Sequence, residues 1–169
     1  MFSGKTEELI RRLVRAKIAQ MNVEIFKPSI DNRYSEEDIV SHNKRVIKSM
    51  AVTSPQDILS HKPQAQVIGI DEAQFFDASI VSVVRQLANE GKRVIVAGLE
   101  KDYLGAPFGP MPELLIEAEY ITKVLSICVK CGDPANFSQR LSAEGGQVVV
   151  GESDKYEARC RKCFDPNHS

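Results

Sequence analysis

The apolar positions of the chain alternate between continuous runs and helical stripes. Two runs, Val67–Ile70 and Val94–Leu99, are uninterrupted, which is typical of parallel strands that are buried on both faces. Between them, Ile80, Val83 and Leu87 recur at helical spacing, and a glycine follows the stripe. Because a strand, a helix and a strand in this order form a βαβ unit, the pattern predicts an α/β fold with a parallel sheet.

Other segments extend this pattern. Residues 23–26 and 46–52 are expected to be strands. A helix begins near Lys5, where an apolar stripe starts, and Asp77 is expected to cap the helix between the two apolar runs. Two more helices are expected, one after the Ser54-Pro55 start signal and one around Leu114.

Composition limits the classes of protein to which the chain can belong. Its 169 residues are enough for one domain with a core and a small appendage. Hydrophobic residues make up 43% and the net charge is -1, so no overall basic field indicates nucleic acid or an anionic membrane as a partner. No apolar run reaches the length of a membrane span, and the N-terminus does not read as a signal peptide.

Two adjacent acids follow the first apolar run. Asp71 and Glu72 come where the strand should leave the sheet, and ligands of open α/β sheets bind outside the carboxyl ends of the strands. Adjacent carboxylates are costly to bury unless a cation or a proton-transfer role keeps them there. The pattern fits a metal–nucleotide site with one acid for Mg²⁺ and one to orient or deprotonate a nucleophile. The structural alternative is an acidic surface turn.

Residues Gly4-Lys5-Thr6 at the start of the first helix match the second half of a phosphate-binding loop. There the helix N-terminus and backbone N–H groups bind phosphate, Lys5 contacts the β/γ oxygens, and Thr6 ligates Mg²⁺. The alternative is an ordinary helix start. A complete loop needs a glycine five residues before Gly4 and a preceding strand, so we expect that the sequence lacks N-terminal residues. Together with Asp71 and Glu72, the tripeptide favours a nucleotide site.

The four cysteines form two Cys-x-x-Cys pairs at positions 128, 131, 160 and 163. In a cytosolic setting such pairs are typical of a tetrahedral Zn²⁺ site, and four thiolates leave no open position for water, so the zinc is expected to be structural. The segment 132–159 between the pairs is then a loop pinned at both ends, which lowers the entropy lost when it closes over a ligand. Arg159, Arg161 and Lys162 permit nucleic-acid binding without requiring it.

Two further groups of residues have both a structural and a functional interpretation. Asp31 and Arg33 lie in a charged loop that is either a solvated connection or part of the phosphate–metal site. Aromatic residues follow the two strand ends, where they either pack in the core or stack on a flat base; these are Phe75, Phe76, Tyr103 and Phe108.

Several separate motifs in one order carry a resemblance over essentially the whole chain. Besides the two cysteine pairs they are residues 1–6 (MFSGKT), 31–34 (DNRY), 70–76 (IDEAQFF), 107–109 (PFG) and 154–156 (DKY). The chain resembles the cellular-type (type II, zinc-containing) thymidine kinases. The resemblance implies a RecA-like P-loop parallel sheet at residues 1–125 and a small zinc-ribbon lasso domain at 126–169. It also implies ATP-dependent phosphorylation of the 5′-hydroxyl of thymidine in the cytoplasm, by a homotetramer that dTTP inhibits.

The resemblance also implies a role for individual residues. Glu72 resembles the general base of the family. The ATP and Mg²⁺ residues would be Ser3, Gly4, Lys5, Thr6, Asp31, Arg33, Asp71 and Gln74. The thymidine pocket would contain Met1, Leu99, Tyr103 and Phe108, with Ser138, Val149 and Tyr156 from the lasso. The zinc ligands would be Cys128, Cys131, Cys160 and Cys163.

Two other functions fit parts of the sequence. An ATP-driven nucleic-acid motor would use residues 71–74 as metal-binding acids and the zinc ribbon to hold a strand, but a second motor domain and a broad basic surface are missing from the sequence. A non-catalytic zinc-ribbon adaptor would leave both Gly4-Lys5-Thr6 and Asp71-Glu72 without a role. We therefore expect a thymidine kinase, with no nucleic acid and no membrane as partners.

Overall fold

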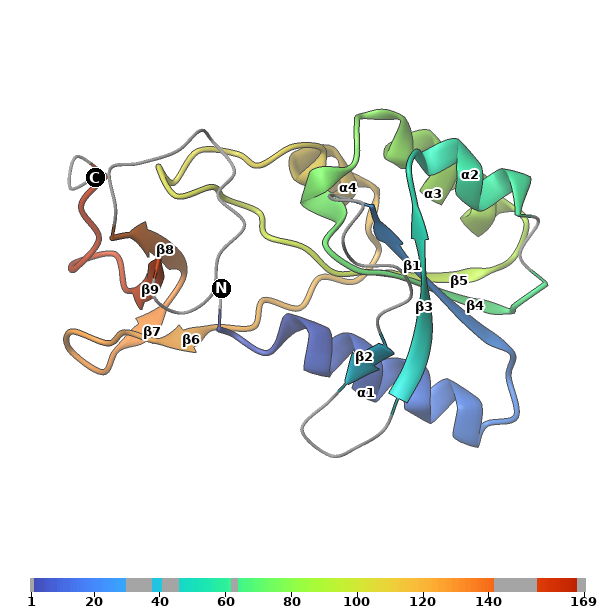
Figure 1. Ribbon diagram of the computed structural model, residues 1–169, viewed down its shortest axis with the longest axis horizontal. Helices are drawn as coiled ribbons and strands as arrows, with labels where there is room; N and C mark the ends of the chain where they lie inside the picture. Colours follow the sequence, from blue (N-terminus) through green and yellow to red (C-terminus); the bar gives the residue numbers. More distant parts are fainter. Residues whose placement is uncertain (1, 30–37, 41–45, 62–63, 142–154, 167–169) are drawn as a thin grey trace. The chain divides into compact units, whose positions relative to one another are not determined.

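The computed structural model describes residues 2–29, 38–40, 46–61, 64–141 and 155–166 (Figure 1). The chain forms two compact units. The first, here called the sheet unit, contains Lys5–Gly98 and Gly109–Glu119. The second, here called the cysteine unit, contains Met1–Gly4, Leu99–Phe108 and Tyr120–Ser169. The predicted domain boundary between residues 125 and 126 stays a prediction.

A five-stranded sheet in the order β2-β3-β1-β4-β5 forms the centre of the sheet unit. Four strands are parallel: β1 (Val23–Pro28), β3 (Val46–Val52), β4 (Val67–Ile70) and β5 (Arg93–Val96). The edge strand β2 (Asp38–Val40) pairs antiparallel with β3. The predicted α/β fold with a parallel sheet is thus confirmed. The strand β5 ends three residues before the end of its apolar run.

Helices cover both faces of this sheet (Figure 1). The helix α1 (Lys5–Ile18) packs on one face, where its buried residues join Ile25 and Val67. The helices α2 (Pro55–Ser60), α3 (Ser79–Asn89) and α4 (Met111–Glu117) pack on the other face. The sheet is therefore the middle layer of three.

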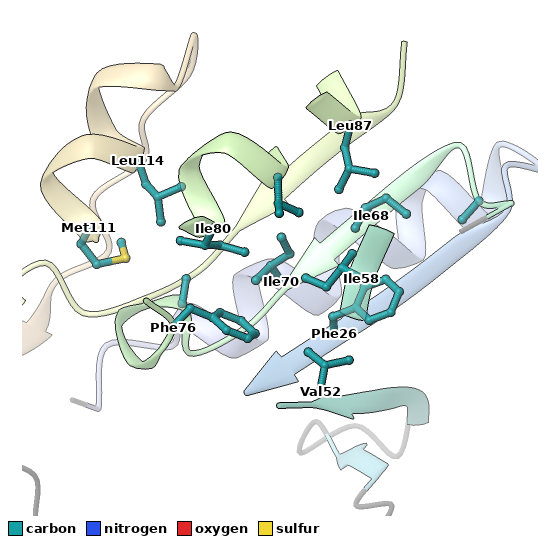
Figure 2. Close-up of a cluster of buried hydrophobic side chains, with 13 residues drawn as sticks. Phe26, Val52, Ile58, Ile68, Ile70, Phe76, Ile80, Leu87, Met111 and Leu114 are labelled. Atoms are coloured by element: carbon teal, nitrogen blue, oxygen red, sulfur yellow. The ribbon is translucent and has the colours of Figure 1, made fainter. Parts of the chain in front are cut away.

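Alternation along the strands explains the two separate cores. Phe26, Ile68 and Ile70 point to the face of α2 and α3, as Figure 2 shows, whereas their neighbours point toward α1 because successive strand residues face opposite sides. Gly69 faces α1, and a Cβ atom there would lie 2.8 Å from Leu13 Cδ1. The glycine thus lets α1 pack closely on β4.

Two helix starts show how the local signals act. Asp57 in the first turn of α2 accepts the N–H of Ser54 at 2.8 Å, as in a capping box. The cap of α3 differs from our prediction, because its N-cap residue is Ala78 and not Asp77. The Asp77 carboxylate nevertheless accepts the Ser79 N–H at 2.8 Å. Asp77, one residue before the N-cap, thus binds an N–H group of the first turn that has no partner within the helix.

The cysteine unit contains two small antiparallel sheets. One pairs β6 (Ser126–Ile127) with β7 (Pro134–Ala135), and the other pairs β8 (Phe137–Arg140) with β9 (Tyr156–Arg159). Among the described residues of this unit, two cysteines and two alanines form one small buried cluster. So small an apolar cluster calls for additional cross-links. Within the described residues, we find no helix with the length and apolarity needed to cross a bilayer.

Candidate functional site

The structure brings the Gly4-Lys5-Thr6 helix start and the acidic strand end together. Asp71 directly follows β4, and its N–H donates to the Phe26 carbonyl of β1 at 2.9 Å. Asp71 is 5% exposed. The Thr6 hydroxyl, in the first turn of α1, donates to Asp71 Oδ2 at 3.0 Å. Two segments that are 65 residues apart in the sequence thus present a hydroxyl and a carboxylate oxygen at one point.

Burial makes the charged form of Asp71 unfavourable. Desolvation, reinforced by the negative charge of Glu72, raises the pKa of Asp71 to about 6. The Thr6 hydroxyl, the Glu72 N–H and the charge of Lys5 lower it in part. A cation beside Asp71 would favour the ionised carboxylate, and a carboxylate with a hydroxyl is a ligand set that Mg²⁺ accepts.

Glu72 is held in an uncommon backbone conformation. Its φ of 51° and ψ of 40° lie in the left-handed region, which costs a residue with a side chain about 1 kcal/mol or more. Its N–H donates to Asp71 Oδ1 at 2.9 Å, and Gln74 Nε2 donates to Glu72 Oε2. The Glu72 side chain is half-buried. The backbone and the Gln74 amide therefore both fix the direction of this carboxylate.

Gln74 is itself packed between two glycines. It is 2% exposed, and a Cβ atom at Gly98 would lie 2.9 Å from Gln74 Oε1. A Cβ atom at Gly109, whose φ is +51°, would lie 2.2 Å from the Gln74 carbonyl oxygen. No local sequence pattern indicates a role for Gly98 or Gly109, because only the tertiary contacts show why a side chain cannot fit at either position.

Other predicted phosphate residues are only partly described. Gly4, whose φ is +76°, directly precedes α1, and Ser3 beside it is half-exposed. Four predicted site residues lie outside the described residues: Met1, Asp31, Arg33 and Val149.

Five predicted thymidine-pocket residues all belong to the cysteine unit: Leu99, Tyr103, Phe108, Ser138 and Tyr156. Ser138 and Tyr156 are buried on β8 and β9. The ring of Tyr103 packs under the guanidinium of Arg140, whose Cζ is 4.8 Å from the ring centroid. The sequence analysis did not assign a role to Arg140. Phe76 packs in the core of the sheet unit, as the structural alternative predicted.

The four cysteines form a cluster that fits a zinc ion. The Sγ atoms of Cys128, Cys131, Cys160 and Cys163 all lie within 4.8 Å of one another. Sulfurs bound tetrahedrally at about 2.3 Å from zinc are roughly 3.8 Å apart, so the cluster needs little adjustment. Each pair is on a tight turn: Gly132 N–H donates to the Cys128 carbonyl at 2.8 Å and Cys163 N–H to the Cys160 carbonyl at 3.1 Å.

The ionisation of these thiols also indicates a cation. Burial raises the pKa of Cys128, but N–H groups of Cys160, Lys130 and Cys131 outweigh it and lower the pKa to about 6. At Cys131 the Asp133 N–H lowers the pKa, whereas the neighbouring thiols raise it to about 12. The four cysteines therefore favour one ionised thiolate and disfavour the ionisation of a second thiol. A divalent ion among the sulfurs would remove that conflict.

Zinc removal gives the first prediction. The protein should contain one zinc per chain, measured by plasma mass spectrometry, and Cys160→Ser should lose most of that zinc because serine is a poor ligand for it. The cysteine unit should unfold with the loss, seen as a lower melting temperature. Full zinc content in the variant would show that the metal binds elsewhere.

The raised pKa of Asp71 gives a second prediction. A carboxyl group whose folded pKa is raised contributes stability that is complete below its unfolded pKa near 4 and is lost as the pH rises through about 6. Without divalent cations, Asp71→Asn should therefore raise the free energy of unfolding at pH 8, by on the order of 2 kcal/mol. At about pH 4 most of this gain should disappear, because Asp71 is then protonated in the folded state and partly protonated in the unfolded state. Urea unfolding of both proteins at each pH measures it, and an equal gain at both values would contradict it.

Comparison with known proteins agrees with this geometry. The family model described as thymidine kinase matches residues 1–164. The chain is 59% identical over 166 residues to a thymidine kinase of Rhodothermus sp. (strain ITI 518), covering 98% of this chain and 78% of the relative. It is 57% identical to one from Bacteroides thetaiotaomicron (97% and 82% covered) and 53% identical to one from Porphyromonas gingivalis (97% and 80% covered). This chain belongs to the thymidine kinase family.

Proposed function

We propose that the protein is a thymidine kinase, which transfers the γ-phosphoryl group of ATP to the 5′-hydroxyl of thymidine. Family membership supports the reaction class. The observation that carries the proposal is the contact of Thr6 with Asp71, because it joins a phosphate-binding helix start to a metal-side acid.

Most of the residues that would hold the nucleotide belong to the sheet unit. Lys5 and the N-terminus of α1 offer positive charge to the phosphates of ATP, with Ser3 and Gly4 before them. Thr6 and Asp71 would hold Mg²⁺, which neutralises charge on the phosphates when bound. Asp31, Arg33 and Gln74 are proposed neighbours of the phosphates; for Gln74, the bond to Glu72 supports a place beside the site.

Glu72 would act as the general base. It is half-buried, whereas Asp71 is almost fully buried, so Glu72 can meet a substrate and Asp71 can hold a cation. Glu72 would accept the proton of the 5′-hydroxyl while that oxygen bonds to the γ-phosphorus and ADP leaves with the electrons of the broken P–O bond. The Gln74 amide orients the carboxylate for this transfer.

The cysteine unit would bind thymidine. The aromatic residues Tyr103 and Phe108 offer flat faces to the base, with Met1, Leu99, Ser138, Val149 and Tyr156 completing the pocket. Zinc would have a structural role, because four thiolates leave no coordination site for a substrate. We further propose a cytoplasmic homotetramer that is inhibited by dTTP, on the resemblance of the motifs alone.

An ATP-consumption assay tests the reaction. ADP production should rise with thymidine and Mg²⁺ and should not respond to single-stranded or duplex DNA, since the net charge of -1 gives no overall basic field to attract it. The product should be dTMP by mass spectrometry. ADP production that responds to DNA and not to thymidine would replace the kinase with a nucleic-acid motor.

Glu72→Gln tests the base. Glutamine keeps an oxygen for the Gln74 amide and cannot take a proton, so turnover should fall by roughly two to four orders of magnitude. ATP binding, measured by calorimetry, should change little. Glu113→Gln, at an exposed glutamate of α4, is the matched control and should have normal turnover. Near-normal turnover of Glu72→Gln would exclude this role.

A further inference from the structure

The loop between Leu99 and Phe108 is organised by one buried acid. Asp102 is 5% exposed, although the turn around it is largely at the surface. Its Oδ1 atom accepts the N–H of Leu104 at 2.9 Å and that of Ala106 at 3.0 Å. Its carbonyl oxygen accepts the Gly105 N–H at 3.0 Å. Three consecutive N–H groups therefore all donate to one residue.

The backbone closes the loop at its base. The Asp102 N–H donates to the Ala106 carbonyl at 2.9 Å, and Lys101 pairs with Pro107 in a short antiparallel bridge. The Phe108 N–H donates to the Glu100 carbonyl at 3.1 Å. The conformation of the turn between Tyr103 and Phe108 therefore determines where these two aromatic side chains lie.

The loop packs against the rest of the cysteine unit at two points. Tyr103 lies under the buried guanidinium of Arg140, the last residue of β8. Gly105 has a φ of +78°, and a Cβ atom there would lie 3.3 Å from the ring of Phe164. Phe164 follows the second cysteine pair, stacks on Phe137 at 4.5 Å and donates its N–H to the Cys160 carbonyl. The turn at residues 102–106 therefore packs against both β8 and the turn of the second cysteine pair.

We infer that Asp102 is a positioning residue for thymidine binding: its carboxylate holds the loop in the form that presents Tyr103 and Phe108 to the nucleoside. The inference rests on the proposed function. The side-chain oxygen is suited to this because Oδ1 alone accepts two N–H groups of the loop, those of Leu104 and Ala106. An asparagine keeps the accepting oxygen, while an alanine leaves the Leu104 and Ala106 N–H groups without this acceptor.

Asp102→Ala and Asp102→Asn separate positioning from a merely structural role. Asp102→Ala should raise the KM for thymidine at least about tenfold, the equivalent of losing one well-placed hydrogen bond. Its kcat at saturating thymidine, its KM for ATP and its zinc content should remain near those of the parent. Asp102→Asn should recover most of the thymidine affinity. Glu119→Ala, which removes an exposed carboxylate, is the control and should change none of these values.

The outcomes are distinct. An unchanged thymidine KM in Asp102→Ala, equal damage in both Asp102 variants, or a joint loss of kcat and zinc overturns the inference. A parent protein without thymidine-dependent turnover overturns the proposed function instead. Should Asp102→Ala not fold by circular dichroism, Gly105→Ala disturbs the same turn with Asp102 intact. That variant should also raise the thymidine KM and not the ATP KM, and an unchanged thymidine KM there overturns the inference.

Discussion

The constraint on which the rest depends is a carboxylate held almost out of water at the end of a central strand. Asp71 ionises at a cost, because burial and Glu72 both oppose its charge. The start of α1 relieves part of that cost through the Thr6 hydroxyl and the charge of Lys5, and the Glu72 N–H also lowers it. Gly69 contributes to this arrangement, because it lets α1 approach β4 closely enough for the two ends to meet.

The pattern of apolar residues predicted the bounds of two strands. The bounds of β3 and β4 agree with the prediction, and all four residues of β4 are buried. The apolar run 94–99 predicted a longer strand than β5, because the apolar residues continue beyond the end of the strand. The first of them, Ala97, donates its N–H to the Ile70 carbonyl and accepts the N–H of Ala73. Local pattern identifies apolar residues and does not show which of them remain paired.

The sequence predicted the chemical groups of the candidate site but not the packing contacts that hold them in place. Adjacent acids, a Gly-Lys-Thr helix start and paired cysteines are local signals, because the chemistry needs those residue types close together in the sequence. Gln74 packs between Gly98 and Gly109, and Arg140 covers the ring of Tyr103. These contacts join residues between 24 and 37 positions apart in the sequence. A single sequence carries no spacing rule for such contacts, so only the fold reveals them.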